Sequence, residues 1–377
     1  MRLSRVWAMA RKEYLHIFRD PRSLGMGIAI PMIMLILFGY ALTLDVDKVP
    51  MVIWDQNRSQ TSREFISHFL GSRYFALQGY VDSYQKVEQA IDERRALVAM
   101  VIPPDFAGRL SAGRTTPVQM IADGSDSNTA TISLGYAEII ISAYSQQIAV
   151  KELQRQGARV MADPLDVRPR VWYNADLESR NYIIPGLIAV IMMVIAALLT
   201  SLTVAREWEQ GTMEQLISTP IKTQELILGK LLPYFAIGLF DVLLAVLMGE
   251  FLFQVPLRGQ PLLIFAQAAI FLIGTLSLGM LISIAAKNQL FASQVAMVAT
   301  FLPAFLLSGF AYPIRSMPIV LQWITYIIPA KYFVTLLKGI YLKGVGPKVL
   351  AVEGLFLVFF AVIMFSLANK KFKKKLV

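Results

Sequence analysis

Residues 23–44 contain no charged side chain, and this run of 22 residues strongly limits how the chain folds. At about 1.5 Å per residue, a helix of that length crosses a hydrocarbon core of about 30 Å. Further runs of membrane length follow residue 181, and the whole chain is 56% hydrophobic but only 16% charged. Soluble domains are typically about 25% charged. We therefore predict a polytopic α-helical membrane protein.

The apolar runs predict six transmembrane helices, at residues 23–44, 182–205, 226–253, 262–286, 290–310 and 349–368. Residues 1–22 carry six basic side chains, and apolar or aromatic residues recur there every three to four positions. That pattern is typical of a helix lying at the cytoplasmic membrane interface. No cleavable signal peptide is predicted, because the first apolar run has full span length.

The charge distribution indicates the orientation of the chain. Residues 45–181 carry 15 basic and 17 acidic side chains, whereas the rest of the chain carries 21 basic and 9 acidic ones. An excess of basic residues beside apolar spans is expected of cytoplasmic flanks, and the tail at 370–375 is rich in lysine. Six spans place both termini in the cytoplasm and residues 45–181 on the opposite side. Because the basic excess flanks membrane spans, no nucleic-acid partner is predicted.

Residues 45–181 alternate short apolar runs with amphipathic stretches, which predicts an inserted α/β domain. A helical pattern from residue 129 to about 156 fits either a stalk or a helix of that domain. Residues 313–345 are apolar but interrupted by three prolines, and a seventh span there would move the lysine-rich tail outside. We predict re-entrant or interfacial helices at 313–345, although their basic residues run against the positive-inside rule.

The sequence offers no group for nucleotide or metal chemistry. No Gly-x-x-x-x-Gly-Lys-Ser/Thr motif occurs, so any nucleotide bound by a P-loop belongs to another chain. There is no cysteine, and the two histidines, His16 and His68, are not part of a ligand-spaced cluster. We predict no catalytic residue, no metal and no cofactor on this chain.

Residues 206–225, between the second and third predicted spans, are polar. Gly211 and Thr212 favour a break and an N-cap, and the Thr219-Pro220 pair favours an end to the helix that follows. A cytoplasmic helix held by a span on each side is suited to pass force from a partner into the membrane. The alternative is a solvated loop between spans.

Asp241 is the one ionisable residue near the middle of a predicted span, with Lys230 and Glu250 near the two ends. A charge there costs about 2.5–3.5 kcal/mol on insertion scales, so its side chain should face the bundle interior, a partner or a water-filled path. One interpretation is a proton-sensitive residue of a substrate path. The other is a carboxyl group that is protonated or hydrogen-bonded to a Ser or Thr of a neighbouring helix.

Short motifs occur in a specific order along essentially the whole chain. They are Arg-Asp-Pro at 19–21, Asp-Gly-Ser and Asn-Thr-Ala within 123–130, Ile-Ile-Pro-Gly at 183–186, Arg-Glu-Trp-Glu and Gly-Thr-Met-Glu within 206–214, Leu-Ser-Gly-Phe and Met-Pro within 307–318, and Tyr-Ile-Ile-Pro-Ala-Lys-Tyr-Phe at 326–333. Together they resemble the membrane permeases of type 2 (ABC-2) ABC exporters, in the bacterial branch with a large periplasmic domain between the first two spans.

The resemblance implies an inner-membrane permease whose residues 206–220 form a coupling helix on a separate ABC ATPase subunit, which binds the ATP and Mg²⁺. It also implies a second permease, as a homodimer or a paralogous heterodimer, with the cargo path near the shared interface. Bacterial members export drugs or amphipathic compounds, often with a periplasmic adaptor (membrane fusion) protein. The coupling residues predicted here are Arg206, Glu207, Trp208, Glu209, Gly211, Thr212, Glu214, Thr219 and Pro220. Candidate residues of a translocation path are Asp241, Ser308 and Gly309.

Two other classes of protein compete with an ATP-driven exporter. An ion-coupled secondary transporter would use Asp241 as its coupling group. A membrane-anchored receptor would bind a ligand in the α/β domain, but six spans without a cytoplasmic output domain argue against it.

Overall fold

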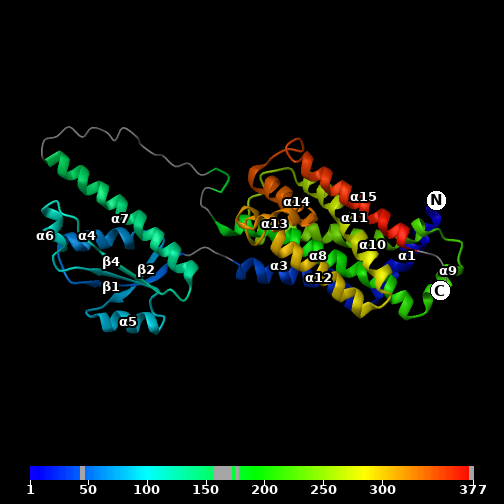
Figure 1. The fold of residues 1–377 in the computed structure, drawn as a ribbon, viewed down its shortest axis with the longest axis horizontal. Helices are drawn as coiled ribbons and strands as arrows, with labels where there is room; N and C mark the ends of the chain where they lie inside the picture. The colour runs from blue at the N-terminus through cyan, green and yellow to red at the C-terminus, as the bar shows by residue number, and fades with distance from the viewer. Residues whose placement is uncertain (43–46, 156–171, 175–177, 373–377) are drawn as a thin grey trace. The chain divides into compact units, whose positions relative to one another are not determined.

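The structure, a computed structural model, describes residues 1–42, 47–155, 172–174 and 178–372. The chain divides into two compact units (Figure 1). The helical unit comprises Met1–Thr43 and Arg170–Val377, and the sheet unit comprises Leu44–Pro169.

Five helices of the described chain are long and apolar enough to cross a membrane. They are α8 (Ser179–Glu209), α10 (Thr223–Leu247) extended by the π-helix η2 (Met248–Leu252), α11 (Pro261–Ala286), α12 (Gln289–Leu307) and α15 (Ala351–Lys371). Each of the five spans predicted after residue 181 overlaps one of these helices. The structure is therefore that of a mostly helical, polytopic membrane protein.

The first predicted span, 23–44, is a series of three helical pieces. These are α2 (Pro21–Leu24), the π-helix η1 (Gly25–Ala29) and α3 (Ile30–Ala41). Gly25 and Gly27 have low helix propensity, and Pro31 has no backbone N–H to donate to the preceding turn. These residues account for the π-helical turn at the point where a regular helix was predicted.

The helix α8 lies at the centre of the helical unit, packed against α3, α10, α11, α12 and α14. Of its most apolar 18-residue stretch, 94% is buried. Polar side chains join it to α11: Thr200 Oγ1 donates to the carbonyl oxygen of Leu276 at 2.9 Å. Ser283 Oγ accepts from the backbone N–H groups of Val204 and Ala205, both at 2.9 Å.

Residues 313–345 form short helices: the 3₁₀ turn η3 (Ile314–Ser316), α13 (Ile319–Thr325), α14 (Pro329–Lys338) and the π-helix η4 (Gly339–Lys343). The chain bends by 81° between α13 and the α14–η4 pair. A broken segment of this kind is compatible with either a bent span or a re-entrant loop.

Two lysines of this segment make contacts within the unit. Lys338 Nζ lies 3.2 Å from the carbonyl oxygen of Gly309 and 3.3 Å from the ring centroid of Tyr182. Lys331 Nζ donates to Thr325 Oγ1 at 3.0 Å and lies 3.4 Å from the ring centroid of Tyr326. Both ammonium groups are therefore in contact with a hydrogen-bond acceptor and an aromatic ring of the same unit.

The sheet unit is built on four strands in the order β2-β1-β3-β4. The strands are β1 (Val49–Asp55), β2 (Phe75–Tyr80), β3 (Val98–Ile102) and β4 (Gln119–Ala122). The strand β1 pairs in parallel with β2 and β3, and β4 is antiparallel to β3. In β1, Met51 and Ile53 contribute to the core on one face and Val52 to the core on the other, as strand periodicity requires.

Helices cover both faces of this sheet (Figure 1). On one face lie α4 (Gln60–Leu70), α6 (Phe106–Ser111) and α7 (Ser127–Arg155), and on the other lies α5 (Tyr84–Asp92). Tyr144 of α7 packs against Phe65 of α4, with ring centroids 5.1 Å apart. The long helix is therefore a helix of the α/β unit, the second of the two interpretations that its pattern left open.

Candidate functional site

The N-terminal helix α1 (Leu3–Arg19) packs along α10. Its inward side is formed by Val6, Met9, Ala10, Glu13 and Ile17, which recur every three to four residues. Gly229 of α10 allows the close approach, because an added Cβ there would lie 2.9 Å from the carbonyl oxygen of Val6. The helix is thus tightly packed on the bundle and brings an acidic residue into its interior.

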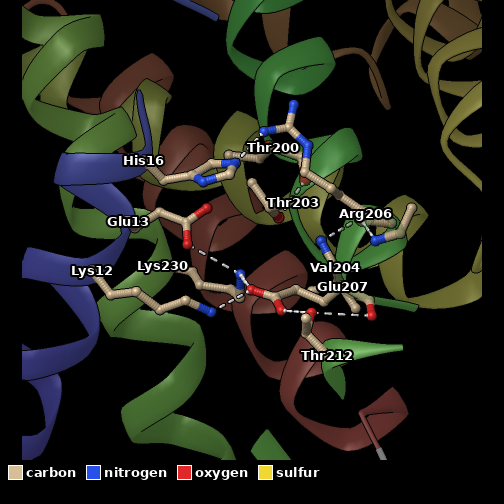
Figure 2. Close-up of polar contacts among 12 residues, drawn as sticks. Lys12, Glu13, His16, Thr200, Thr203, Val204, Arg206, Glu207, Thr212 and Lys230 are labelled. Atoms are coloured by element: carbon tan, nitrogen blue, oxygen red, sulfur yellow. Dashed lines mark hydrogen bonds and ion pairs between the residues drawn. The ribbon is translucent and has the colours of Figure 1, made fainter. Parts of the chain in front are cut away.

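A buried cluster of charges joins α1 to α8 and α10 (Figure 2). Lys230 of α10 is fully buried, and its Nζ lies 3.2 Å from Glu13 Oε2 and 3.2 Å from Glu207 Oε1. Lys12 Nζ also donates to Glu207 Oε1, at 2.8 Å. Two ammonium groups therefore neutralise two carboxylates, which is the condition under which buried charges are tolerated.

Hydroxyl groups complete the hydrogen bonding of this cluster. Tyr234 OH donates to Glu13 Oε1 at 3.2 Å, and Thr212 Oγ1 donates to Glu207 Oε2. Thr212 is the first residue of α9 (Thr212–Ser218), the short helix after α8. Glu207 consequently joins α1, α9 and α10 through one carboxylate.

Two further sets of contacts connect the ends of these helices. Arg206 Nη1 lies 2.6 Å from His16 Nε2 and 3.8 Å from Asp20 Oδ2. Glu209 Oε1 accepts from the backbone N–H of Gln289 at 2.9 Å, which joins the end of α8 to the start of α12. The junction at the end of α8 is therefore fixed to α1 on one side and to α12 on the other.

The predicted coupling segment, 206–225, is divided at Gly211, where its sequence favours a break. Residues 206–209 are the last turn of α8, α9 is a separate helix, and α10 already begins at Thr223. Gly211 separates α8 from α9 with a φ of +69°, the left-handed region that favours glycine. Gly211 occupies the N-cap position predicted for Thr212, and the Thr212 hydroxyl binds Glu207 instead.

The predicted coupling residues fall into two groups. Glu207 is buried, and Arg206, Trp208, Thr212 and Thr219 are partly buried. Glu209, Gly211, Glu214 and Pro220 are exposed. Pro220 accepts a hydrogen bond from Arg5, and Lys287 Nζ lies 4.7 Å from the Trp208 ring centroid. Of the exposed group, Glu209 and Pro220 are thus bonded within the chain, whereas Glu214 lies on the exposed side of α9.

The exposed side of α9 consists of Glu214, Gln215 and Ser218. On its other side Met213 is 1% exposed and packs into the core of the helical unit. Within the described chain, the Glu214 carboxylate forms no salt bridge. The helix α9 thus has a short exposed polar side, and Met213 on its opposite side packs it against the helical unit.

The three candidate path residues lie apart from this cluster. Asp241 is 2% exposed, and its Oδ1 has no hydrogen-bond partner among the residues that the structure describes. This does not support the interpretation in which a neighbouring Ser or Thr binds it. Ser308 is also buried, and the Gly309 carbonyl accepts from Tyr182 OH at 2.9 Å as well as from Lys338.

Sequence reasoning did not single out Glu13 or Lys12, and it treated Lys230 only as a charge near the end of a span. The sequence signal that could have revealed them is an acidic and a basic residue that each lie among apolar residues of a helix. Glu13 lies on the apolar side of α1, four residues from both Met9 and Ile17, and Lys230 lies in an apolar helix. Among the described residues, no group of His, Asp or Glu side chains has metal-site geometry.

Comparisons with known proteins define the class to which this arrangement belongs. The family model described as "ABC-2 family transporter protein" matches residues 21–369. The chain therefore belongs to the ABC-2 transporter family. It is a non-catalytic permease subunit of an ABC exporter in the inner membrane, and ATP is hydrolysed on a separate subunit.

Individual relatives are similar over nearly their full lengths. The "Probable multidrug ABC transporter permease YbhS" of Escherichia coli K12 is 41% identical over 373 residues, 99% of this chain and 97% of the relative. "Probable multidrug ABC transporter permease YbhR" of the same organism is 32% identical over 342 residues, 90% of each chain. "Inner membrane transport permease YhhJ" is 26% identical over 361 residues, 91% of this chain and 92% of the relative.

Proposed function

We propose that this permease moves drugs or other amphipathic compounds outward from the cytoplasm or the inner membrane. Two of the similar permeases are named for multidrug transport, which supports this class of cargo. The abundant apolar and aromatic side chains of the spans are compatible with such cargo. Energy comes from the ATPase subunit and enters through α9.

The observation that best supports the coupling role is the set of polar contacts between α9 and the neighbouring helices. Its exposed side offers Glu214 and Gln215 to a partner, and behind it Thr212 and Glu207 connect α9 to Lys230 of α10 and to α1. A displacement of α9 is thereby transmitted to α10 and α1 together through short polar contacts. A solvated loop would lack these contacts and could not transmit force in this way.

Charge reversal at Glu214 tests this role. We expect Glu214→Arg to lower co-purification of the ATPase subunit at least about tenfold, the change that about 1.4 kcal/mol gives, and to lower export in parallel. The measurement is the ATPase-to-permease ratio after affinity purification from membranes, with export followed in cells.

The matched control is Glu88→Arg, which reverses an exposed charge on α5 of the sheet unit. Glu88→Arg should leave the ATPase-to-permease ratio and the export rate unchanged. Wild-type ATPase recovery with Glu214→Arg would refute direct docking on α9, and equal losses in both variants would point to general surface charge.

The proposed arrangement has six spans, with α2, η1 and α3 as the first span and residues 313–345 as a re-entrant segment. Both termini are then cytoplasmic, and residues 45–181 form a periplasmic domain. A second permease, identical or paralogous, completes the cargo path, and a periplasmic adaptor is a further proposed partner. Cysteines introduced singly into this cysteine-free chain, at Glu88 and at Glu214, should react with a membrane-impermeant thiol reagent from opposite sides.

We assign Asp241 to the cargo path, because its buried carboxyl group has an oxygen without a partner among the described residues. Asp241→Asn keeps the size and removes the ionisation. We expect it to lower export about tenfold, equivalent to about 1.4 kcal/mol, and to flatten the pH dependence of the export rate. The control is Glu250→Gln, an exposed acid at the far end of the same helix. Full export with an unchanged pH profile for Asp241→Asn would exclude this role.

A further inference from the structure

An apolar groove of about 590 Å³ lies between α1 and α10. Its lining on α1 is Trp7, Ala10, Arg11, Tyr14 and Leu15, and its lining on α10 is Leu232, Pro233 and Ala236. The groove is separate from the buried charge cluster, which lies on the inward side of α1. None of the coupling or path residues named above lines it.

The helix α1 has three sides, of which the first packs on the bundle. A second side carries Arg5, Lys12, His16 and Arg19. The third is apolar and exposed, with Trp7 at 66%, Tyr14 at 50% and Phe18 at 52% exposure. A helix with a packed side, a basic side and an exposed aromatic side suits the boundary between water and lipid, where aromatic side chains are enriched.

Arg11 is the exception on the aromatic side. It lies four residues after Trp7 and three before Tyr14, so it belongs to that side and not to the basic one. Its side chain is exposed, and none of the described residues pairs with it through a hydrogen bond or salt bridge. An unpaired guanidinium group beside an apolar groove is complementary to a ligand that has an anionic head and an apolar tail.

The groove continues as an apolar track along α10. Four apolar side chains of α10 are 40–46% exposed: Leu232, Phe240, Leu243 and Leu247. Their spacings of eight, three and four residues place them on one side of the helix. From Leu232 to Leu247 this track spans roughly 22 Å at about 1.5 Å per residue. That length accommodates an extended acyl chain within a hydrocarbon core of about 30 Å.

We propose that the groove binds an anionic glycerophospholipid of the bilayer, with its phosphate on the Arg11 guanidinium and one acyl chain between Trp7 and Leu232. Arginine binds phosphate oxygens through paired N–H donors, and the aromatic rings of Trp7 and Tyr14 suit the level of the ester groups. The bound lipid fills the space beside Pro233 and holds α1 against α10. A cationic amphiphile is disfavoured at this site because Arg11 repels it.

The site can be tested by quenching of Trp7 fluorescence in full-length permease reconstituted in lipid nanodiscs. The Trp7 signal is the difference between wild type and Trp7→Phe, because four other tryptophans are present. Dibrominated phosphatidylglycerol should have a quenching association constant about fivefold above that of dibrominated phosphatidylcholine. About 1 kcal/mol per basic residue near a membrane gives this ratio.

Two variants separate a site from general attraction to the membrane surface. Arg11→Gln should bring the ratio to about one, whereas Arg19→Gln, which removes the same charge from the basic side, should leave it near fivefold. An unaltered thermal unfolding temperature for Arg11→Gln shows that the fold is retained.

Equal quenching by the two lipids in the wild type would overturn the proposal, and so would equal changes in both variants. Rhodamine 6G, a cationic amphiphile, should not displace the brominated phosphatidylglycerol. Displacement by rhodamine 6G that becomes stronger in Arg11→Gln would identify the groove as a cargo site and would also overturn the lipid proposal.

Discussion

Replacing Lys230 by methionine is expected to lower the free energy of unfolding of the permease by about 3–5 kcal/mol. Lys230 is fully buried, and its ammonium group lies 3.2 Å from a carboxylate oxygen of both Glu13 and Glu207. Methionine has a similar volume, so the loss arises from two buried carboxylates, of which Glu207 keeps its salt bridge to Lys12 while Glu13 loses its salt bridge to Lys230. Thermal unfolding of the solubilised permease measures the effect, and ATPase coupling should fail with it.

The cluster supplies its own controls. Lys12 contacts the same Glu207 carboxylate, but its side chain is 50% exposed, so Lys12→Met should cost at most about 1 kcal/mol. The double variant Lys230→Met, Glu13→Gln retains the Lys12–Glu207 pair and should recover most of the lost stability. If the double variant is no more stable than Lys230→Met alone, the buried charge is not the cause.

Gly279→Ala is expected to destabilise the contact between α8 and α11 by about 1–3 kcal/mol or more. An added methyl group would overlap the carbonyl oxygen of Ala197 and the hydroxyl of Thr200, and it would lie 2.9 Å from the carbonyl carbon of Ala197. The obstacle is mostly backbone, so no rotamer change relieves it, and the two helices must separate. The expected result is a lower unfolding temperature together with loss of export.

Gly25→Ala is the matched control, because it adds the same methyl group to a glycine of the π-helix η1 where nothing lies within 4 Å. It should be neutral or slightly stabilising, since alanine has the higher helix propensity. Equal stability of the two variants would contradict the close approach of α8 and α11.

Thr200→Val tests the hydrogen bond from Thr200 to the carbonyl oxygen of Leu276. We expect this variant to lower the free energy of unfolding by about 1 kcal/mol.

The sequence predicts the helices of this protein well where one physical rule dominates. A membrane requires backbone hydrogen bonds to be made within a segment, so apolar runs such as 262–286 are read directly as helices. The alternation of short apolar runs with amphipathic stretches within 45–181 likewise predicts an α/β fold, and the sheet unit has four strands with helices on both faces. The predicted membership of the ABC-2 family is confirmed by comparison with known proteins.

The candidate site was only partly predictable, because its contacts join residues far apart in sequence. Glu13 and Lys230 are 217 positions apart, and no local pattern predicts their contact. The motif at 206–214 does not reveal that Glu207 is buried while Glu214 is exposed. Burial depends on how α1 packs against α10, and local periodicity does not contain that information.

The enclosure of α8 has a consequence for how the protein is made. This helix is synthesised after α3 but before α10, α11, α12 and α14, so four of the five helices that pack against it do not yet exist when it enters the bilayer, and lipid takes their place first. Lipid tails are as apolar as its own side chains, so their replacement depends on close packing and on a few interhelical hydrogen bonds. Insertion and folding of α8 are therefore separate events, and a nascent chain that stops after α10 would hold it fully inserted but not yet folded into its bundle.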